Sequence, residues 1–190
     1  MKKVIFMVAA FFALTTGAVQ AQNNIFKINI LSPVVSTGSV FYERTIADDK
    51  SLQLGLFYTG FSVGDTKFSG FGVTPEFRKY LSSSKQAPEG FYLAPFLRYQ
   101  SFNLETEYSN DWSSDSRTTT AEATYNTFGG GLLIGKQWVF IDRIVLDTFF
   151  GPSYNAGNIK AKDGADEETF ETGAFGGFGI RTGVALGIKF

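Results

Sequence analysis

The chain has 190 residues, with 17 basic and 18 acidic side chains, a net charge of −1 at pH 7, no histidine and no cysteine. The missing histidine and cysteine exclude a histidine base, a thiol nucleophile, disulfides and the transition-metal sites that these residues build. The near-neutral charge also argues against nucleic acid as a partner, because such binding needs clustered positive charge.

The first 21 residues have the pattern of a secretory signal peptide. Lys2 and Lys3 form a positive start, and an apolar stretch follows over residues 4–14. Small residues then lead to Ala21, which predicts cleavage before Gln22. An uncleaved helical anchor is the alternative, but the apolar stretch is short for a membrane span. We therefore expect a secreted protein.

The mature chain, residues 22–190, has 15 basic and 18 acidic residues and alternates between apolar and polar or small residues. A period of two is typical of β-strands whose two faces meet different surroundings. The alternating segments are 25–31, 39–46, 52–63, 68–81, 91–108, 127–139, 144–155 and 178–190. Pro75, Pro95 and Pro152 interrupt three of them, and we expect a β-bulge at each because proline cannot donate to a strand ladder.

The connections between these segments indicate how the strands are arranged. In outer-membrane barrels the turns on the periplasmic side are short and the outer loops are long. The expected inner connections are 47–50, 82–90 and 140–143, and the expected outer ones are 32–38, 64–67, 109–126 and 161–177. The two longest lie on the outer side. We therefore predict an all-β fold, an eight-stranded antiparallel transmembrane β-barrel that forms one domain over residues 22–190.

The last segment alternates without a break up to an aromatic C-terminal residue. Its outward face consists of Phe178, Ile180, Thr182, Val184, Leu186, Ile188 and Phe190. This pattern resembles the closing strand of bacterial outer-membrane barrels, in which a terminal Phe with alternating hydrophobic residues is the assembly signal. The resemblance implies that Leu186, Ile188 and Phe190 are recognised by the barrel-assembly machinery.

Segments 24–32, 38–44 and 72–80 resemble a family of small outer-membrane barrels of unknown function from Bacteroidota, and more broadly the OmpX and OmpA-barrel class. The resemblance spans essentially the whole mature chain, although it rests on strand patterns rather than on a catalytic signature. It implies an eight-stranded barrel in the outer membrane. We further expect a monomer in the outer membrane of a Gram-negative bacterium, in contact with lipid and lipopolysaccharide, with both termini in the periplasm. It carries over no activity.

The strand parity places seven charged residues in the lumen. They are Lys27, Glu43, Glu76, Arg78, Arg98, Asp147 and Arg181, four basic and three acidic. An eight-stranded barrel is only wide enough for side chains to fill, so charges inside it must pair to offset their desolvation. We therefore expect an ion-pair network that fills the lumen. A narrow gated polar pore and a carboxylate-based active site are the alternatives.

The expected outer loops hold the other candidates. Five carboxylates could bind Ca²⁺ or Mg²⁺, although they lack the EF-hand spacing and a solvated loop is the simpler interpretation: Asp163, Asp166, Glu167, Glu168 and Glu171. Tyr108 and Trp112 could contact a partner or belong to an aromatic girdle. We expect no enzyme, cofactor or metal site. The expected role is structural or a surface interaction with an unknown ligand, and a passive channel is the alternative.

Overall fold

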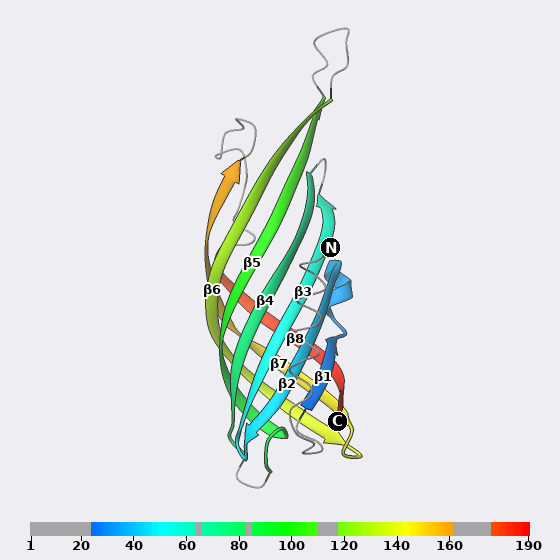
Figure 1. The fold of residues 1–190 in the computed structure, drawn as a ribbon, viewed down its shortest axis with the longest axis vertical. Helices are drawn as coiled ribbons and strands as arrows, with labels where there is room; N and C mark the ends of the chain where they lie inside the picture. Colours follow the sequence, from blue (N-terminus) through cyan, green and yellow to red (C-terminus); the bar gives the residue numbers. More distant parts are fainter. Residues whose placement is uncertain (1–23, 64–65, 83–84, 110–117, 162–175) are drawn as a thin grey trace, which may run out of the picture.

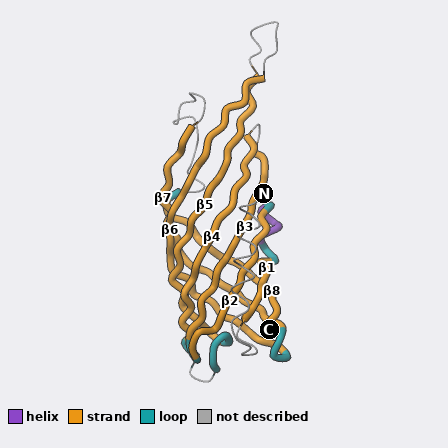
Figure 2. The backbone as a smooth tube through the Cα atoms, viewed as in Figure 1, coloured by secondary structure: helices purple, strands orange, loops and turns teal. Residues whose placement is uncertain are grey.

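The computed structural model describes residues 24–63, 66–82, 85–109, 118–161 and 176–190. Within them the chain forms a barrel of eight β-strands and one short 3-10 helix, η1 (Figures 1 and 2). The elements are β1 Asn24–Asn29, η1 Ser32–Val35, β2 Thr37–Ala47, β3 Lys50–Val63, β4 Thr66–Tyr80, β5 Gly90–Ser109, β6 Thr118–Phe140, β7 Ile144–Ala161 and β8 Gly177–Lys189. Neighbouring strands pair antiparallel in chain order, and β8 pairs with β1. The predicted fold class is confirmed. No helix of the described part is long and apolar enough to cross a membrane.

The two ends of the barrel differ. At one end the N–H of Asn24 donates to the carbonyl of Phe190 at 3.2 Å, and the N–H of Phe190 donates to the carbonyl of Asn24 at 2.8 Å. The connections 48–49, 81–89 and 141–143 lie at this same end, which we call the turn end. The opposite end is the hairpin end, where β5 and β6 run well beyond the other strands (Figure 1).

The long hairpin of β5 and β6 corrects the expected loop at 109–126. The two strands stay paired as far as Ser109 and Thr118, so β6 includes residues 118–126 of that segment. Threonine is a good strand former, which explains why this Ser/Thr-rich sequence continues the ladder. The neighbouring strands stop earlier, because β4 pairs with β5 up to Thr106 and β7 pairs with β6 up to Ala123. The last part of the hairpin is therefore a two-stranded projection.

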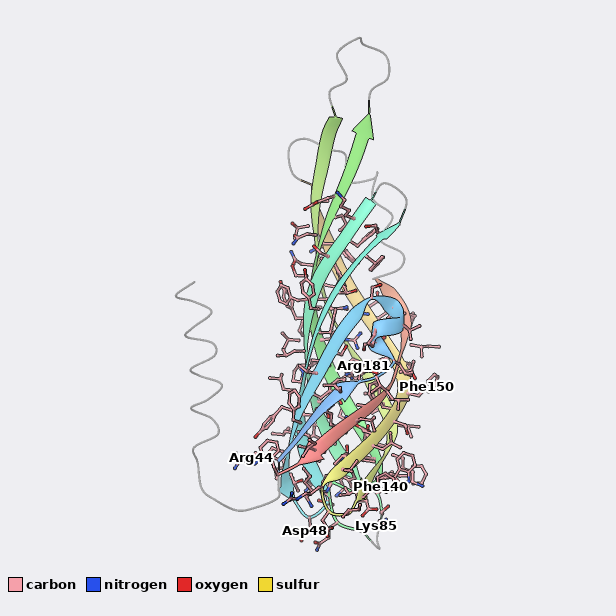
Figure 3. The ribbon with its side chains drawn as sticks, turned by 90° about the vertical axis from the view of Figure 1, so that its right-hand side faces the viewer. Arg44, Asp48, Lys85, Phe140, Phe150 and Arg181 are labelled. Atoms are coloured by element: carbon pink, nitrogen blue, oxygen red, sulfur yellow. The ribbon has the colours of Figure 1, made fainter. Side chains whose placement is uncertain are left out.

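The side chains follow the predicted alternation. Ile188 on β8 and Phe190, which follows the strand, are 62% and 56% exposed, whereas Arg181 on the opposite face of β8 is 8% exposed. Phe140 and Phe150, both exposed, likewise lie on the outside of the wall (Figure 3). The outer wall is therefore largely apolar, whereas the lumen holds both charged or polar side chains and large aromatic rings.

The three prolines do not produce the expected bulges. The strand register is constant through Pro75, Pro95 and Pro152, and the register shift recorded among the described residues lies between Thr45 and Ala47. All three prolines are exposed on the wall, at positions where the β4–β5 or β6–β7 ladder lapses. The barrel thus accommodates each proline by leaving a few residues unpaired with the neighbouring strand, and no extra residue is inserted.

Large aromatic rings in the lumen lie opposite glycine on the neighbouring strand. The ladder pairs are Phe41–Gly55, Phe57–Gly72, Phe102–Gly70, Tyr92–Gly135, Phe96–Gly131 and Phe149–Gly183. A Cβ on Gly72 would collide with the ring of Phe57, and one on Gly135 with the ring of Tyr92. Because glycine has no side chain, each ring can lie against the glycine backbone of the neighbouring strand. This packing in a narrow lumen accounts for the abundance of glycine and of aromatic residues.

Candidate functional site

The lumen contains a buried ion-pair network, which we define as Lys27, Glu43, Glu76, Arg78, Asp147 and Arg181. Lys27 reaches it from β1, beside the seam where β1 meets β8. Its Nζ lies 2.6 Å from Oε2 of Glu43 and 2.8 Å from Oδ2 of Asp147. It also donates to Oε1 of Gln137 at 2.7 Å. Lys27 therefore joins β1 to β2, β6 and β7.

Arg78 on β4 is the centre of the network. One guanidinium nitrogen, Nη1, lies 2.8 Å from Oδ2 of Asp147 and 3.4 Å from Oε2 of Glu43. The other, Nη2, lies 3.2 Å from Oε2 of Glu76. The guanidinium carbon also sits 4.4 Å from the centroid of the Tyr92 ring, a cation–π distance. Arg78 thus contacts all three carboxylates of the network.

Neutral polar side chains satisfy the oxygens that the cations leave over. Tyr80 donates to Oε1 of Glu43 at 2.7 Å, and Tyr92 donates to Oδ1 of Asp147 at 2.7 Å. Ser51 Oγ donates to Glu43 at 2.5 Å, and Gln53 Nε2 donates to Glu76 at 3.1 Å. None of these four partners is among the sequence candidates, although the alternation of the predicted segments places Gln53, Tyr80 and Tyr92 inward.

The two remaining arginines behave differently from each other. Arg181 on β8 pairs with Glu76, with Nη2 2.6 Å from Oε1. Arg98 on β5, which strand parity predicts in the same network, forms no salt bridge with a carboxylate among the described residues. Its guanidinium carbon lies 5.4 Å from the centroid of the Phe96 ring, and that of Arg181 lies 4.8 Å from the same ring.

The connection between β4 and β5 covers the turn end of the lumen. Pro88 is buried, and its carbonyl accepts a hydrogen bond of 2.7 Å from Nε2 of Gln137. The N–H of Ala87 donates to the carbonyl of Asp48 at 2.7 Å, and Ala87 packs against the buried aromatic cluster of the lumen. Figure 3 shows Asp48 and Lys85 at this end of the barrel. A folded segment therefore lies between the network and the medium at the turn end.

The network and its polar partners take at least one side chain from each of the eight strands. Three cations face three carboxylates, and those carboxylates are no more than 2% exposed. Buried ions are tolerated where the charges are paired and the remaining oxygens are hydrogen-bonded, as they are in this network. The arrangement can brace the barrel across its section and obstruct the lumen. Its carboxylates are not accessible to a substrate.

Several sequence candidates lie outside the described residues. They are the cleavage site at Ala21 and Gln22, Trp112, and the acidic residues Asp163, Asp166, Glu167, Glu168 and Glu171. The side chain of Tyr108 also falls outside the description. The described residues contain no group of three or more carboxylates placed to hold a metal ion. The residues of the proposed assembly signal, Leu186, Ile188 and Phe190, are exposed on the outer wall.

The fold was compared with solved structures of outer-membrane proteins. The chain is similar to a major outer membrane protein from Thermus thermophilus, with a TM-score of 0.53 and 11% identity over 90% of this chain and 100% of that chain. It is also similar to the N-terminal β-barrel domain of Pseudomonas aeruginosa OprF, with a TM-score of 0.40 and 14% identity over 90% of this chain and 100% of that one. For Acinetobacter baumannii CarO2 the TM-score is 0.45, with 11% identity over 89% and 98% of the two chains. The Thermus likeness shows the fold.

Sequence comparison adds a family but no activity. No curated protein matches the sequence. A family model described as "Protein of unknown function (DUF3575)" matches residues 5–160, which is most of the chain. The chain therefore belongs to the DUF3575 family of proteins of unknown function.

Proposed function

We propose that the protein is a monomeric outer-membrane barrel with a closed lumen, which acts structurally or through the parts that project from its hairpin end. The observation that carries this proposal is the ion-pair network, whose carboxylates are buried and which, together with its polar partners, takes side chains from every strand. The segment around Pro88, which covers the turn end, adds a second obstruction. A passive channel would need both to move aside.

The apolar outer wall supports the membrane location. Large hydrophobic side chains are exposed on strands around the whole barrel, and examples are Phe26, Leu52, Phe71, Phe128 and Phe150. Exposing such a surface to water is unfavourable, whereas lipid covers it at no cost. In the proposed orientation the turn end, with the C-terminus, faces the periplasm, and the hairpin end faces the cell exterior. The Bacteroidota origin stays a prediction.

The closed lumen predicts that the folded protein does not conduct ions. Refolded barrel, identified by its heat-modifiable migration, should give no discrete current steps when it is inserted into a planar lipid bilayer. The physical reason is that permeating ions would have to displace Arg78 and Lys27 from buried carboxylates, at a large electrostatic cost.

A conducting porin reconstituted by the same procedure is the positive control, and unfolded chain in the same detergent is the negative one. Reproducible unitary steps from the folded protein, absent from the unfolded sample, would support the passive channel instead.

We propose no catalytic role for the network. Glu43 and Asp147 are fully buried and hold cations and hydroxyl donors on both carboxylate oxygens. General acid–base catalysis requires a group within reach of the substrate proton. We propose three kinds of partner instead of a substrate. They are outer-membrane lipid and lipopolysaccharide at the wall, the assembly machinery during biogenesis, and an unknown surface ligand at the hairpin end.

The projecting hairpin should be dispensable for the barrel. Deleting residues 107–120 and closing β5 to β6 with a short turn should leave a folded, heat-modifiable protein in the outer membrane. The reason is that β4 and β7 pair with this hairpin only as far as Thr106 and Ala123, so the strand residues removed have no neighbour in the wall. The measurement is the yield of folded protein in isolated outer membranes.

Protease added to intact cells should cut the wild-type protein within this hairpin and spare the shortened one. Loss of the folded band on shortening would show that the projection belongs to the scaffold, and the recognition role would then have to be given up.

A further inference from the structure

A cavity of about 280 Å³ lies in the lumen on the hairpin side of the ion-pair network. Arg98 and Arg181 both line it, and Val35 of η1 and Ile180 of β8 extend it to the rim of the barrel. Val35 and Ile180 are 66% and 69% exposed, so the cavity reaches the surface at this rim. In the orientation proposed above, the cavity is accessible from outside the cell.

The cavity carries positive charge that the described residues do not neutralise. The three carboxylates of the lumen are already matched by Lys27, Arg78 and Arg181, which leaves Arg98 as a further cation. Arg181 is 8% exposed, and its Nη1 is buried without a hydrogen-bond partner in the described part of the chain. The same holds for Nε of Arg98. Buried guanidinium groups are costly when their charge and their donors are uncompensated.

The polar part of the remaining lining suits an anion, and the other side chains of the lining are apolar: Val35, Phe41, Leu56, Phe57, Phe149 and Ile180. The described residues that line it include no aspartate or glutamate, and hydroxyl and amide side chains lie around the two arginines: Asn29, Ser32, Thr37, Ser39, Thr74 and Gln100. Hydroxyl and amide groups donate hydrogen bonds to an oxyanion, and guanidinium forks bind one through paired N–H donors. The cavity volume of about 280 Å³ lies at the lower end of the range for small-molecule pockets, roughly 300–1,000 Å³, and is ample for a small oxyanion.

We propose that this cavity is a binding site for one small oxyanion of the carboxylate or phosphate type, held between Arg98 and Arg181. The bound anion supplies the charge that the lumen lacks and hydrogen-bonds the donors that have no partner. The proposal does not depend on the protein's being a closed structural barrel: conductance measurements test that function, and anion binding tests this site.

The test uses radiolabelled inorganic phosphate in equilibrium dialysis against the folded mature protein in a zwitterionic detergent. We expect saturable binding of about one phosphate per barrel, since both guanidinium groups face a single cavity. Acetate should displace the phosphate, and chloride at the same ionic strength should not. Chloride is a single spherical ion and has no pair of oxygens to accept the two parallel N–H hydrogen bonds of a guanidinium group. Equal displacement by chloride would indicate simple charge screening and would overturn the proposal.

Arg98→Gln should abolish phosphate binding and leave the barrel folded, because Arg98 has no ion pair in the described structure. Arg143→Gln is the matched control, since it removes one arginine from the exposed 141–143 turn and should keep wild-type binding. Arg98→Lys keeps the positive charge but loses the paired N–H donors of the guanidinium group, and it should bind phosphate about tenfold more weakly. This variant therefore still tests the site if Arg98→Gln fails to fold.

Three results would overturn the site: no saturable binding to the wild type, full binding by Arg98→Gln, or equal loss in Arg143→Gln. If a carboxylate of the acidic segment 163–171 filled the cavity, the wild type would show no saturable phosphate binding.

Discussion

Replacing Arg78 with Met should lower the free energy of unfolding of the barrel by about 3–5 kcal/mol, the usual cost of removing one partner from a buried ion pair. Methionine keeps much of the side-chain volume but leaves three buried carboxylates facing only Lys27 and Arg181. The measurement is a urea titration of the barrel folded in lipid vesicles, followed by tryptophan fluorescence and checked by refolding.

Arg143→Met is the matched control, because it removes the same charge from an exposed turn and should change the free energy of unfolding by no more than about 0.5 kcal/mol. A second test combines Arg78→Met with Asp147→Asn, which neutralises one of the stranded carboxylates and should recover part of the loss. If Arg78→Met were as harmless as Arg143→Met, the network would not brace the barrel.

Replacing Phe190 with Lys, or deleting it, should reduce the amount of folded protein in the outer membrane severalfold. The ring is 56% exposed on the outer wall, so it contributes little packing within the barrel, and the pairing of Phe190 with Asn24 uses backbone atoms only. The effect should therefore come from recognition during assembly. Measurement of the heat-modifiable band in outer-membrane fractions gives the yield.

Refolding of the purified Phe190→Lys chain in detergent separates recognition from stability, and its yield should stay close to that of the wild type. Phe178→Lys is the matched control, because it changes the same face at the other end of β8 and should assemble normally in cells. Normal assembly of Phe190→Lys would remove this residue from the assembly signal.

Much of the fold follows from a period-two pattern that is local to each strand. Alternation depends only on neighbouring residues of one strand. It therefore predicts that Lys27, Glu43 and Arg181 face inward, even when the neighbouring strands and the contacting side chains are not known. Strand ends were less predictable. The Thr-rich start of β6 was interpreted as loop because it lacks apolar alternation, although the ladder continues there with Ser109 opposite Thr118.

The composition of the site was predictable only in part. Which lumen residues meet depends on the stagger of the closed barrel, a global property that no single segment carries. Strand parity predicts Arg98 in the same network as the other charges, whereas in the closed barrel it forms no salt bridge with a carboxylate of the described residues. The prolines illustrate the same limit, because whether Pro75 or Pro152 inserts a bulge or only interrupts a ladder depends on the neighbouring strand.

The pairing of Lys27 with Asp147 has a consequence for how the barrel forms. These residues are 120 positions apart, in the first and seventh strands, and the seam between β1 and β8 lies beside them. A sheet still open at that seam leaves Asp147 without Lys27 and presents its charged face to lipid, which is costly. Closure of the seam and burial in the bilayer should therefore occur in one concerted step, and partly inserted sheets should not accumulate during folding.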